Sequence, residues 1–134
     1  MVKMTVEYAG DLHCTALHGP SGSRLETDAP VDNHGRGESF SPTDLVGTAL
    51  ATCMATVMGI YARRTGIDLA GMKIEVGKEM TQTPPRRIER LNVEIRMPAT
   101  VEHDPALENA ARTCPVILSL HPDIEKPVTF HWEK

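Results

Sequence analysis

The segment Ser41–Gly66 constrains the fold most, because it reads as one long helix with both ends marked. Ser41 suits the N-cap position, Pro42 suits the first helical position, and the Asp44 carboxylate comes three residues after the cap, where it can accept free backbone N–H groups. A glycine directly after a helix can adopt the left-handed conformation that ends it, so Gly66 marks the other end. The sequence therefore predicts a helix of more than twenty residues.

Apolar residues along this helix share one side at 100° per residue, and we expect that side to be buried. The stripe consists of Val46, Ala49, Leu50, Cys53, Val57 and Ile60. On this interpretation Cys53 is a small core residue. The apolar part, Leu45–Tyr61, is interrupted by glycines and threonines and is shorter than the roughly 20 residues of a membrane span. We therefore expect no membrane partner.

Alternating and punctuated segments predict further elements on both sides of the helix. An antiparallel meander should cover Lys3–Ala9, Leu12–His18 and Ser23–Asp28, followed by a loop over residues 29–40. After the long helix we expect further antiparallel strands, Met72–Glu79, Ile88–Met97 and a last strand Pro127–Trp132, with a second helix from Pro105 to about Thr113 and a short third helix Val116–Leu120 before that last strand. The length of 134 residues predicts a single domain, 1–134.

Composition excludes several classes of function. The formal net charge is −4 and the basic residues are scattered, which argues against a nucleic-acid partner. The segment Met1–Tyr8 lacks the pattern of a signal peptide and reads as a strand. Three cysteines at irregular spacing do not form a disulfide framework and favour a reducing compartment, so we expect a cytoplasmic location.

Metal and hydrolase sites are not indicated by the remaining motifs. His13 and Cys14 are adjacent on a predicted strand and so point to opposite faces, and the other histidines are isolated. We therefore expect no metal and no cofactor. The Gly-x-Ser-x-Gly motif of serine hydrolases is absent. A histidine beside Cys53 or Cys114, as in cysteine hydrolases, is left open by the sequence.

A thiol with a cation and a carboxylate is the constellation that remains. Reduction of a peroxide needs a thiolate that attacks one oxygen and a donor that stabilises the departing alkoxide. Arg36 lies between two glycines on the 29–40 loop just before the long helix, and Arg24 is the alternative. Either Asp44 or Glu38 could orient the guanidinium through a bidentate pair.

The residues alone do not decide which thiol attacks. An apolar helix face disfavours a thiolate at Cys53, whereas Cys114 directly precedes Pro115 and a predicted helix start, where the helix dipole favours negative charge. Both thiols therefore stay candidates at this point.

The run Glu38–Leu45, the run Ala49–Met54 and the later Cys114-Pro115 resemble the OsmC/Ohr family of osmotically inducible and organic hydroperoxide resistance proteins. The resemblance implies an OsmC-like α+β fold in which two subunits intertwine as a homodimer with active sites at their interface. It also implies that Cys53 is the peroxidatic thiol, that Cys114 resolves it through an intramolecular disulfide, and that an arginine and an acid complete the site.

Two functions follow as expectations. The first is a peroxiredoxin-like, thiol-dependent peroxidase of the oxidative stress response that reduces organic hydroperoxides, and hydrogen peroxide as a further substrate, with an external thiol or dithiol as reductant. The apolar side chains around Cys53 suit an alkyl tail. The alternative is a non-catalytic dimer that binds a small apolar ligand beside the same helix, with Cys53 merely packed.

Overall fold

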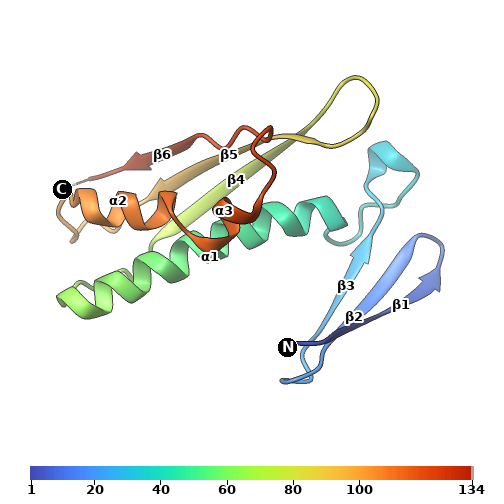
Figure 1. Ribbon diagram of the computed structural model, residues 1–134, viewed down its shortest axis with the longest axis horizontal. Helices are drawn as coiled ribbons and strands as arrows, with labels where there is room; N and C mark the ends of the chain where they lie inside the picture. The colour runs from blue at the N-terminus through green and yellow to red at the C-terminus, as the bar shows by residue number, and fades with distance from the viewer. Residues whose placement is uncertain (134) are drawn as a thin grey trace. The chain divides into compact units, whose positions relative to one another are not determined.

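The computed structural model describes residues 1–133, and its elements match the predicted order (Figure 1). In chain order they are β1 (Met4–Gly10), β2 (His13–His18), β3 (Arg24–Asp28), the 3-10 turn η1 (Val31–Asn33), α1 (Pro42–Thr65), β4 (Lys73–Met80), β5 (Ile88–Arg96), α2 (Pro105–Arg112), α3 (Pro115–Ser119) and β6 (Val128–His131). The turn η1 was not predicted. The α+β class is confirmed.

The chain contains two compact units, an N-terminal unit (Met1–Val46) and a C-terminal unit (Gly47–Lys134). The single domain expected from length therefore stays a prediction. Each unit has its own three-stranded sheet, with strand order β1-β2-β3 in the first and β4-β5-β6 in the second.

The N-terminal unit is an antiparallel meander followed by a tightly folded loop. Val6 pairs with Ala16, and Ala16 pairs with Leu25 on the third strand, so these side chains share one face of the sheet. The loop over residues 29–40 turns back on itself at Gly35. A Cβ atom at Gly35 would lie 1.7 Å from the carbonyl oxygen of Ala29, so this close approach of two backbone segments requires glycine.

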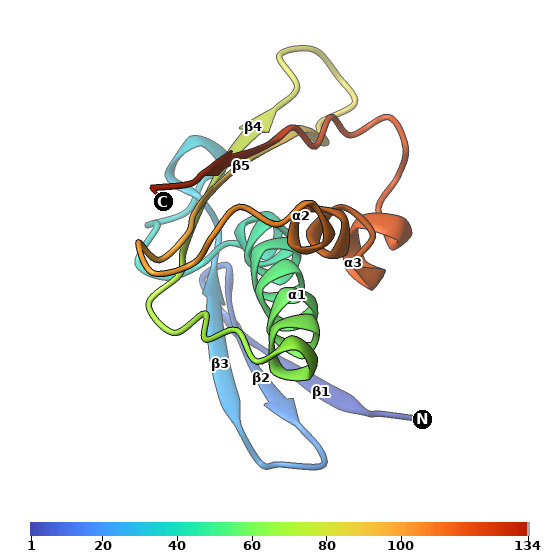
Figure 2. The same ribbon diagram turned by 90° about the vertical axis from the view of Figure 1, so that its left-hand side faces the viewer.

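The C-terminal unit packs helices on one face of its sheet, as Figures 1 and 2 show for α1 and α2. The alternation along β5 buries every second side chain. The core combines Leu50, Met54 and Met58 of α1 with Leu91, Val93 and Ile95 of β5 and Leu107 of α2. A Cβ atom added at Gly47 would lie 3.4 Å from Leu91 and 3.6 Å from Val76, which is ordinary van der Waals contact, so this part of α1 faces the sheet.

The predicted buried stripe of α1 was wrong in its direction. The buried positions are Gly47, Leu50, Ala51, Met54, Met58 and Ala62, whereas Ala49 and Ile60 are exposed and Cys53 is half-buried. The helix is apolar on several sides, so hydropathy alone does not select the packed side. Tertiary packing selects it, and three of its six buried positions, 47, 51 and 62, are glycine or alanine.

The last strand also differs from expectation. The predicted later strands were antiparallel, and β4 and β5 do pair so, but β6 pairs with β5 in parallel, from Val93↔Val128 to Arg96↔His131. The physical reason is the connection. The chain between β5 and β6 contains α2 and α3, which form the crossover that a parallel pair needs.

Helix α1 is longer than the apolar stretch judged from the sequence. It has 24 residues, and its most apolar window has a mean hydropathy of 1.7, so length and composition alone would allow it to cross a membrane. Only 28% of that window is buried within the chain. The length of the apolar stretch therefore does not exclude a membrane span, and the exposed apolar side of α1 needs another explanation.

Candidate thiol site

Cys53 lies in the middle of α1, at the border between the packed and the exposed side of the helix. Its neighbours Leu50 and Met54 are fully buried, while its own side chain is half-buried. Reagents of small size can therefore reach this thiol within the C-terminal unit.

Cys114 occupies the tight corner between α2 and α3 and is fully buried. It is the N-cap residue of α3, with Pro115 at the first helical position. Its sulfur accepts a hydrogen bond from the backbone N–H of Ile117 at 3.4 Å, as a cap side chain does. The corner thus fixes the direction of this thiol.

The structure brings these two thiols together. The pKa of Cys114 is raised above its ordinary value, first by burial and also by a hydrogen bond with the Cys53 side chain and the repulsion of a charge there. The N–H groups of Ile117 and Val116 act in the opposite direction. Burial therefore outweighs the helix start at Cys114. The expectation that the helix start would favour the thiolate of Cys114 was therefore wrong, because burial has the larger effect.

Hydrogen bonds in the first half of α2 join this helix to α1 and to the segment that follows β6. The Asp104 side chain caps α2 by accepting the N–H of Ala106, and it also accepts the Tyr61 hydroxyl of α1 at 3.0 Å. At the same helix, Glu108 accepts the indole N–H of Trp132 at 2.8 Å. Both thiols therefore lie on elements that are fastened to one another.

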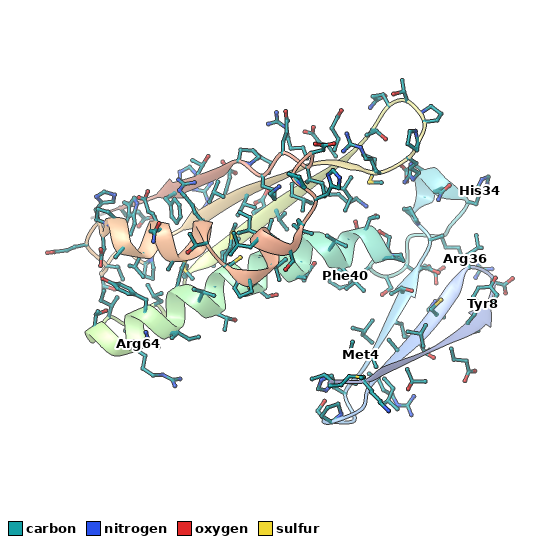
Figure 3. The ribbon with its side chains drawn as sticks, in the orientation of Figure 1. Met4, Tyr8, His34, Arg36, Phe40 and Arg64 are labelled. Atoms are coloured by element: carbon teal, nitrogen blue, oxygen red, sulfur yellow. The ribbon has the colours of Figure 1, made fainter. Side chains whose placement is uncertain are left out.

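The predicted charged partners, Arg36, Glu38 and Asp44, belong to the N-terminal unit. Arg36 and Glu38 line one hollow of about 330 Å³ there, together with His13 and Asp28. Figure 3 labels Arg36 on the loop between β3 and α1. Their catalytic roles beside the thiols stay predictions.

Asp44 has the capping role expected of it. Its carboxylate accepts the N–H of Ser41 at 3.0 Å, and the Ser41 hydroxyl accepts the N–H of Asp44 at 3.0 Å. The alternative arginine, Arg24, is the first residue of β3 and pairs with Leu17.

His13 and Asp28 are residues that the sequence analysis missed as a pair. They are direct cross-strand partners on β2 and β3, and the His13 Nδ1 atom lies 3.4 Å from the Asp28 carboxylate. The predicted hairpin over residues 12–28 contained the signal, because its register places these two residues opposite each other. The pair follows from strand register and not from a local motif.

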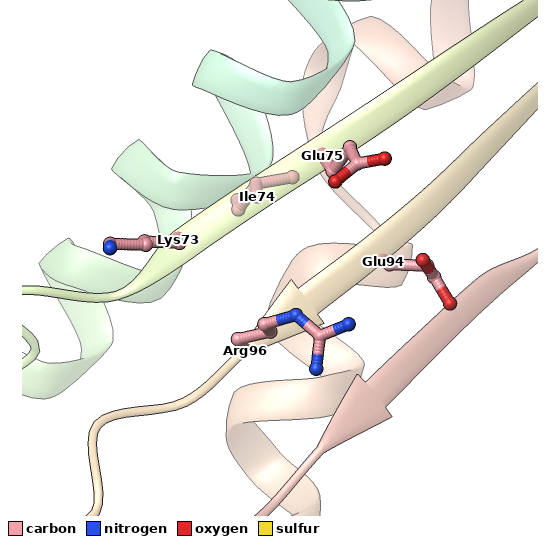
Figure 4. Close-up of a pocket in the computed structure, with 5 residues that line it drawn as sticks. All are labelled: Lys73, Ile74, Glu75, Glu94 and Arg96. Atoms are coloured by element: carbon pink, nitrogen blue, oxygen red, sulfur yellow. The ribbon is translucent and has the colours of Figure 1, made fainter.

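An open groove of about 520 Å³ lies elsewhere, on the solvent face of β4 and β5 (Figure 4). Lys73 faces Arg96 across the strands, and Glu75 faces Glu94. None of the predicted site residues lines this groove. Its mixed charges are those of a solvated sheet face.

The three cysteines are free thiols. Within residues 1–133, no group of three or more His, Cys, Asp or Glu side chains is arranged to hold a metal ion.

Comparison with known proteins supports one family. The family model for the OsmC-like protein matches residues 35–126. A protein from Psychrobacter arcticus 273-4, whose name gives it an inferred role in osmotic stress induction and detoxification response, is 46% identical, with 98% of this chain and 96% of that chain covered and a TM-score of 0.90. Among curated proteins, none matches the chain.

More distant structures share the fold. An OsmC-like protein from Mycoplasma pneumoniae is 14% identical, with 100% of this chain and 98% of that chain covered and a TM-score of 0.82. The organic hydroperoxide resistance protein OhrB of Bacillus subtilis is 15% identical, with 98% of each chain covered and a TM-score of 0.71. Together with the family model and the near relative, these matches lead to one conclusion: the chain belongs to the OsmC-like protein family.

Proposed function

We propose that the protein is a thiol-dependent peroxidase that reduces organic hydroperoxides, and also hydrogen peroxide, to alcohols or water. The observation that carries this proposal is that Cys53 lies close enough to Cys114 to raise its pKa, with Cys53 half-buried and Cys114 fully buried. The accessible Cys53 is the attacking thiol. The buried Cys114, whose pKa is raised, keeps its proton until it is needed.

The reaction balances with these two residues. The Cys53 thiolate attacks the terminal oxygen of the hydroperoxide, the O–O bond breaks, and the alkoxide leaves and takes up a proton as the alcohol. Cys53 is then a sulfenic acid. The Cys114 sulfur attacks the Cys53 sulfur, an S–S bond forms, the S–O bond breaks, and water leaves with the Cys114 proton. An external thiol or dithiol returns the two electrons by disulfide exchange.

The charged residues complete the proposal. Arg36 stabilises the attacking thiolate and the leaving alkoxide, and Glu38 or Asp44 orients its guanidinium. Arg36 and Glu38 already line one hollow, which favours them as a pair. Arg24 is the alternative arginine. The name of OhrB of Bacillus subtilis, a protein of the same fold, refers to organic hydroperoxide resistance and supports this substrate class.

A homodimer is part of the proposal, because too much apolar surface is left open in one chain. Helix α1 has a mean hydropathy of 1.7 in a window that is only 28% buried. On its exposed side, the Thr52 and Thr56 hydroxyls bond backbone carbonyls of the helix itself at 2.9 and 2.8 Å, so they need no water. A second copy of the chain covers this side and lines the apolar approach to Cys53 for an alkyl tail.

The location follows from the same chemistry. Free thiols that must be re-reduced after each turnover fit the reducing cytoplasm and a role in the oxidative stress response. Because the α1 surface is assigned to the second copy, the proposal needs no membrane.

A peroxide consumption assay tests the proposal. The reduced protein is mixed with cumene hydroperoxide and dithiothreitol, and the wild type is compared with Cys53→Ser and with Cys14→Ser. Cys14 is also a free thiol, on β2, and serves as the matched control. We expect Cys53→Ser to lose turnover and Cys14→Ser to keep it. Equal turnover in the wild type and Cys53→Ser refutes the peroxidase, and an apolar ligand that co-purifies with the protein then favours the binding alternative.

A further inference from the structure

Asp28, the last residue of β3, is the one charged side chain that is buried in residues 1–133, at 5% exposure. Both of its oxygens have partners. One accepts the backbone N–H of Glu38 at 3.0 Å, and the other lies 3.4 Å from Nδ1 of His13. A buried carboxylate needs such partners, because a buried charge without hydrogen bonds strongly destabilises the folded state.

Asp28 also stands at the root of the loop that carries Arg36. Its own N–H donates to the carbonyl of Phe40 at 3.0 Å, so the two ends of the 29–40 loop are joined there. Its side chain then reaches across the loop to Glu38, two residues beyond Arg36. The hollow lined by Arg36 and Glu38 has His13 and Asp28 on its other side. One carboxylate therefore ties the sheet to the segment that bears the candidate arginine.

His13 adds a titratable partner to this tie. Its ring lies between two carboxylates of β3, Asp28 and, at 3.3 Å from Nε2, Glu26. The other charged groups that line the hollow are Asp11, Arg36 and Glu38. The pKa of His13 is raised above 6.5, first by the hydrogen bond with Glu26, against the effect of burial, and further by Asp28.

We propose that Asp28 and His13 form a latch that holds the 29–40 loop, and with it Arg36, against the sheet of the N-terminal unit, and that this latch loosens when His13 loses its proton. Asp28 is thus a positioning residue, acting through the loop backbone. The effect on turnover rests on the proposed function of Arg36. The latch itself does not.

The sign of the pH effect follows from the raised pKa of His13. A base with a raised pKa in the folded state contributes its attraction fully below its ordinary pKa and loses it as the pH rises through the folded value. The latch should therefore be tight in weakly acidic solution. It should loosen just above the pH at which a free histidine titrates.

Amide hydrogen exchange at Glu38, measured by NMR and corrected for the intrinsic rate, tests the latch without reference to catalysis. In the wild type, exchange at Glu38 should rise severalfold over the pH range in which the His13 ring titrates in the same sample. Asp28→Asn, which keeps the size but removes the charge, should exchange faster at every pH, and His13→Gln should lose the pH step.

Glu26→Gln is the matched control. Glu26 contacts His13 and lies on β3 like Asp28, but the bond to the backbone N–H of Glu38 is made by Asp28. It should keep the pH step and move it to lower pH, since the largest cause of the raised His13 pKa is removed. Unchanged protection of Glu38 in Asp28→Asn, or the wild-type pH step in His13→Gln, overturns the latch.

The turnover arm separates this inference from the proposed function. We expect Asp28→Asn to lower kcat/KM for cumene hydroperoxide about tenfold, as a displaced catalytic group does, and to add nothing in an Arg36→Ala background. If Asp28→Asn loses the protection of Glu38 but keeps full turnover, while Arg36→Ala is impaired, the positioning role of Asp28 is overturned and the role of Arg36 stands. Full turnover in Arg36→Ala itself overturns the role of Arg36, and with it the catalytic effect of the latch, whatever the exchange at Glu38.

Discussion

The two units of this chain differ in the kind of side chain that each one buries. In the C-terminal unit the buried side chains come from α1, β5 and α2 and are apolar, with Leu50, Leu91 and Leu107 fully buried. In the N-terminal unit the buried side chains are Asp28 and Ser41, both polar and both hydrogen-bonded to backbone N–H groups. The N-terminal meander instead exposes Met4, Val6 and Tyr8 along one face of β1.

Because of this difference, the two parts of the proposed site, the thiol pair and the arginine loop, are held in place by different interactions. Cys114 lies in the apolar core of the C-terminal unit, and the half-buried Cys53 lies close enough to it to raise its pKa. Arg36 and Glu38 lie on a loop held by backbone hydrogen bonds and one buried carboxylate. The placement of the thiol pair should therefore tolerate changes of surface charge, while the placement of the arginine should respond to surface charge and to pH.

The largest expected effect is on stability, from a matched pair of truncations. Leu91→Ala removes a fully buried side chain and should lower the free energy of unfolding by about 2–5 kcal/mol. Val6→Ala removes an exposed side chain and should cost less than about 0.5 kcal/mol at protein concentrations where the chain is monomeric. Chemical denaturation measures both. Equal costs under those conditions would erase the contrast between the units.

A smaller effect is expected for the arginine. Arg36→Ala should slow peroxide turnover by an order of magnitude or more, because one charged donor at a developing oxyanion is worth about 3 kcal/mol. Arg36→Lys should restore only part of the rate, since lysine keeps the charge but lacks the planar fork. Steady-state kinetics with cumene hydroperoxide measures this. Normal rates in Arg36→Ala together with a loss in Arg24→Ala would transfer the role to Arg24.

The smallest effect is the pH dependence that the buried thiol adds to stability. The folded state raises the pKa of Cys114 above 9.0, so the native thiol keeps its proton at a pH where the unfolded thiol has lost it. Stability should therefore fall as the pH rises past the ordinary thiol value. Denaturation curves from pH 8 to pH 10 should show this fall in the wild type and in Cys14→Ala, and a shallower fall in Cys114→Ala. Parallel slopes in all three proteins would contradict it.

Local signals in the sequence predicted much of this structure. The reciprocal cap of Ser41 and Asp44 and the proline starts of α2 and α3 depend on neighbouring residues only, and they were predicted where they occur. Which side of α1 packs depends instead on residues far away in sequence, such as Leu91 of β5, which Gly47 faces. Hydropathy along one helix contains no record of that contact.

The candidate site divides in the same way. Cys53 and Cys114 were selected from the sequence, but Cys53 was expected in the core and is half-buried, and the full burial of Cys114 was not predicted, because it depends on how the corner after α2 packs. The pair of His13 and Asp28 was missed, since it depends on strand register rather than on a motif. Residue type identified the chemistry, and tertiary packing decided which group is buried.

Disulfide mapping after a single exposure to peroxide tests the central claim most directly. The fully reduced protein is treated with cumene hydroperoxide in the absence of any added thiol, alkylated, digested and analysed by mass spectrometry, with Cys14 as the internal reference. The account predicts an intrachain disulfide between Cys53 and Cys114, with Cys14 alkylated as a free thiol. Cys53 and Cys114 both recovered as free thiols, or Cys53 joined to Cys14, would contradict it.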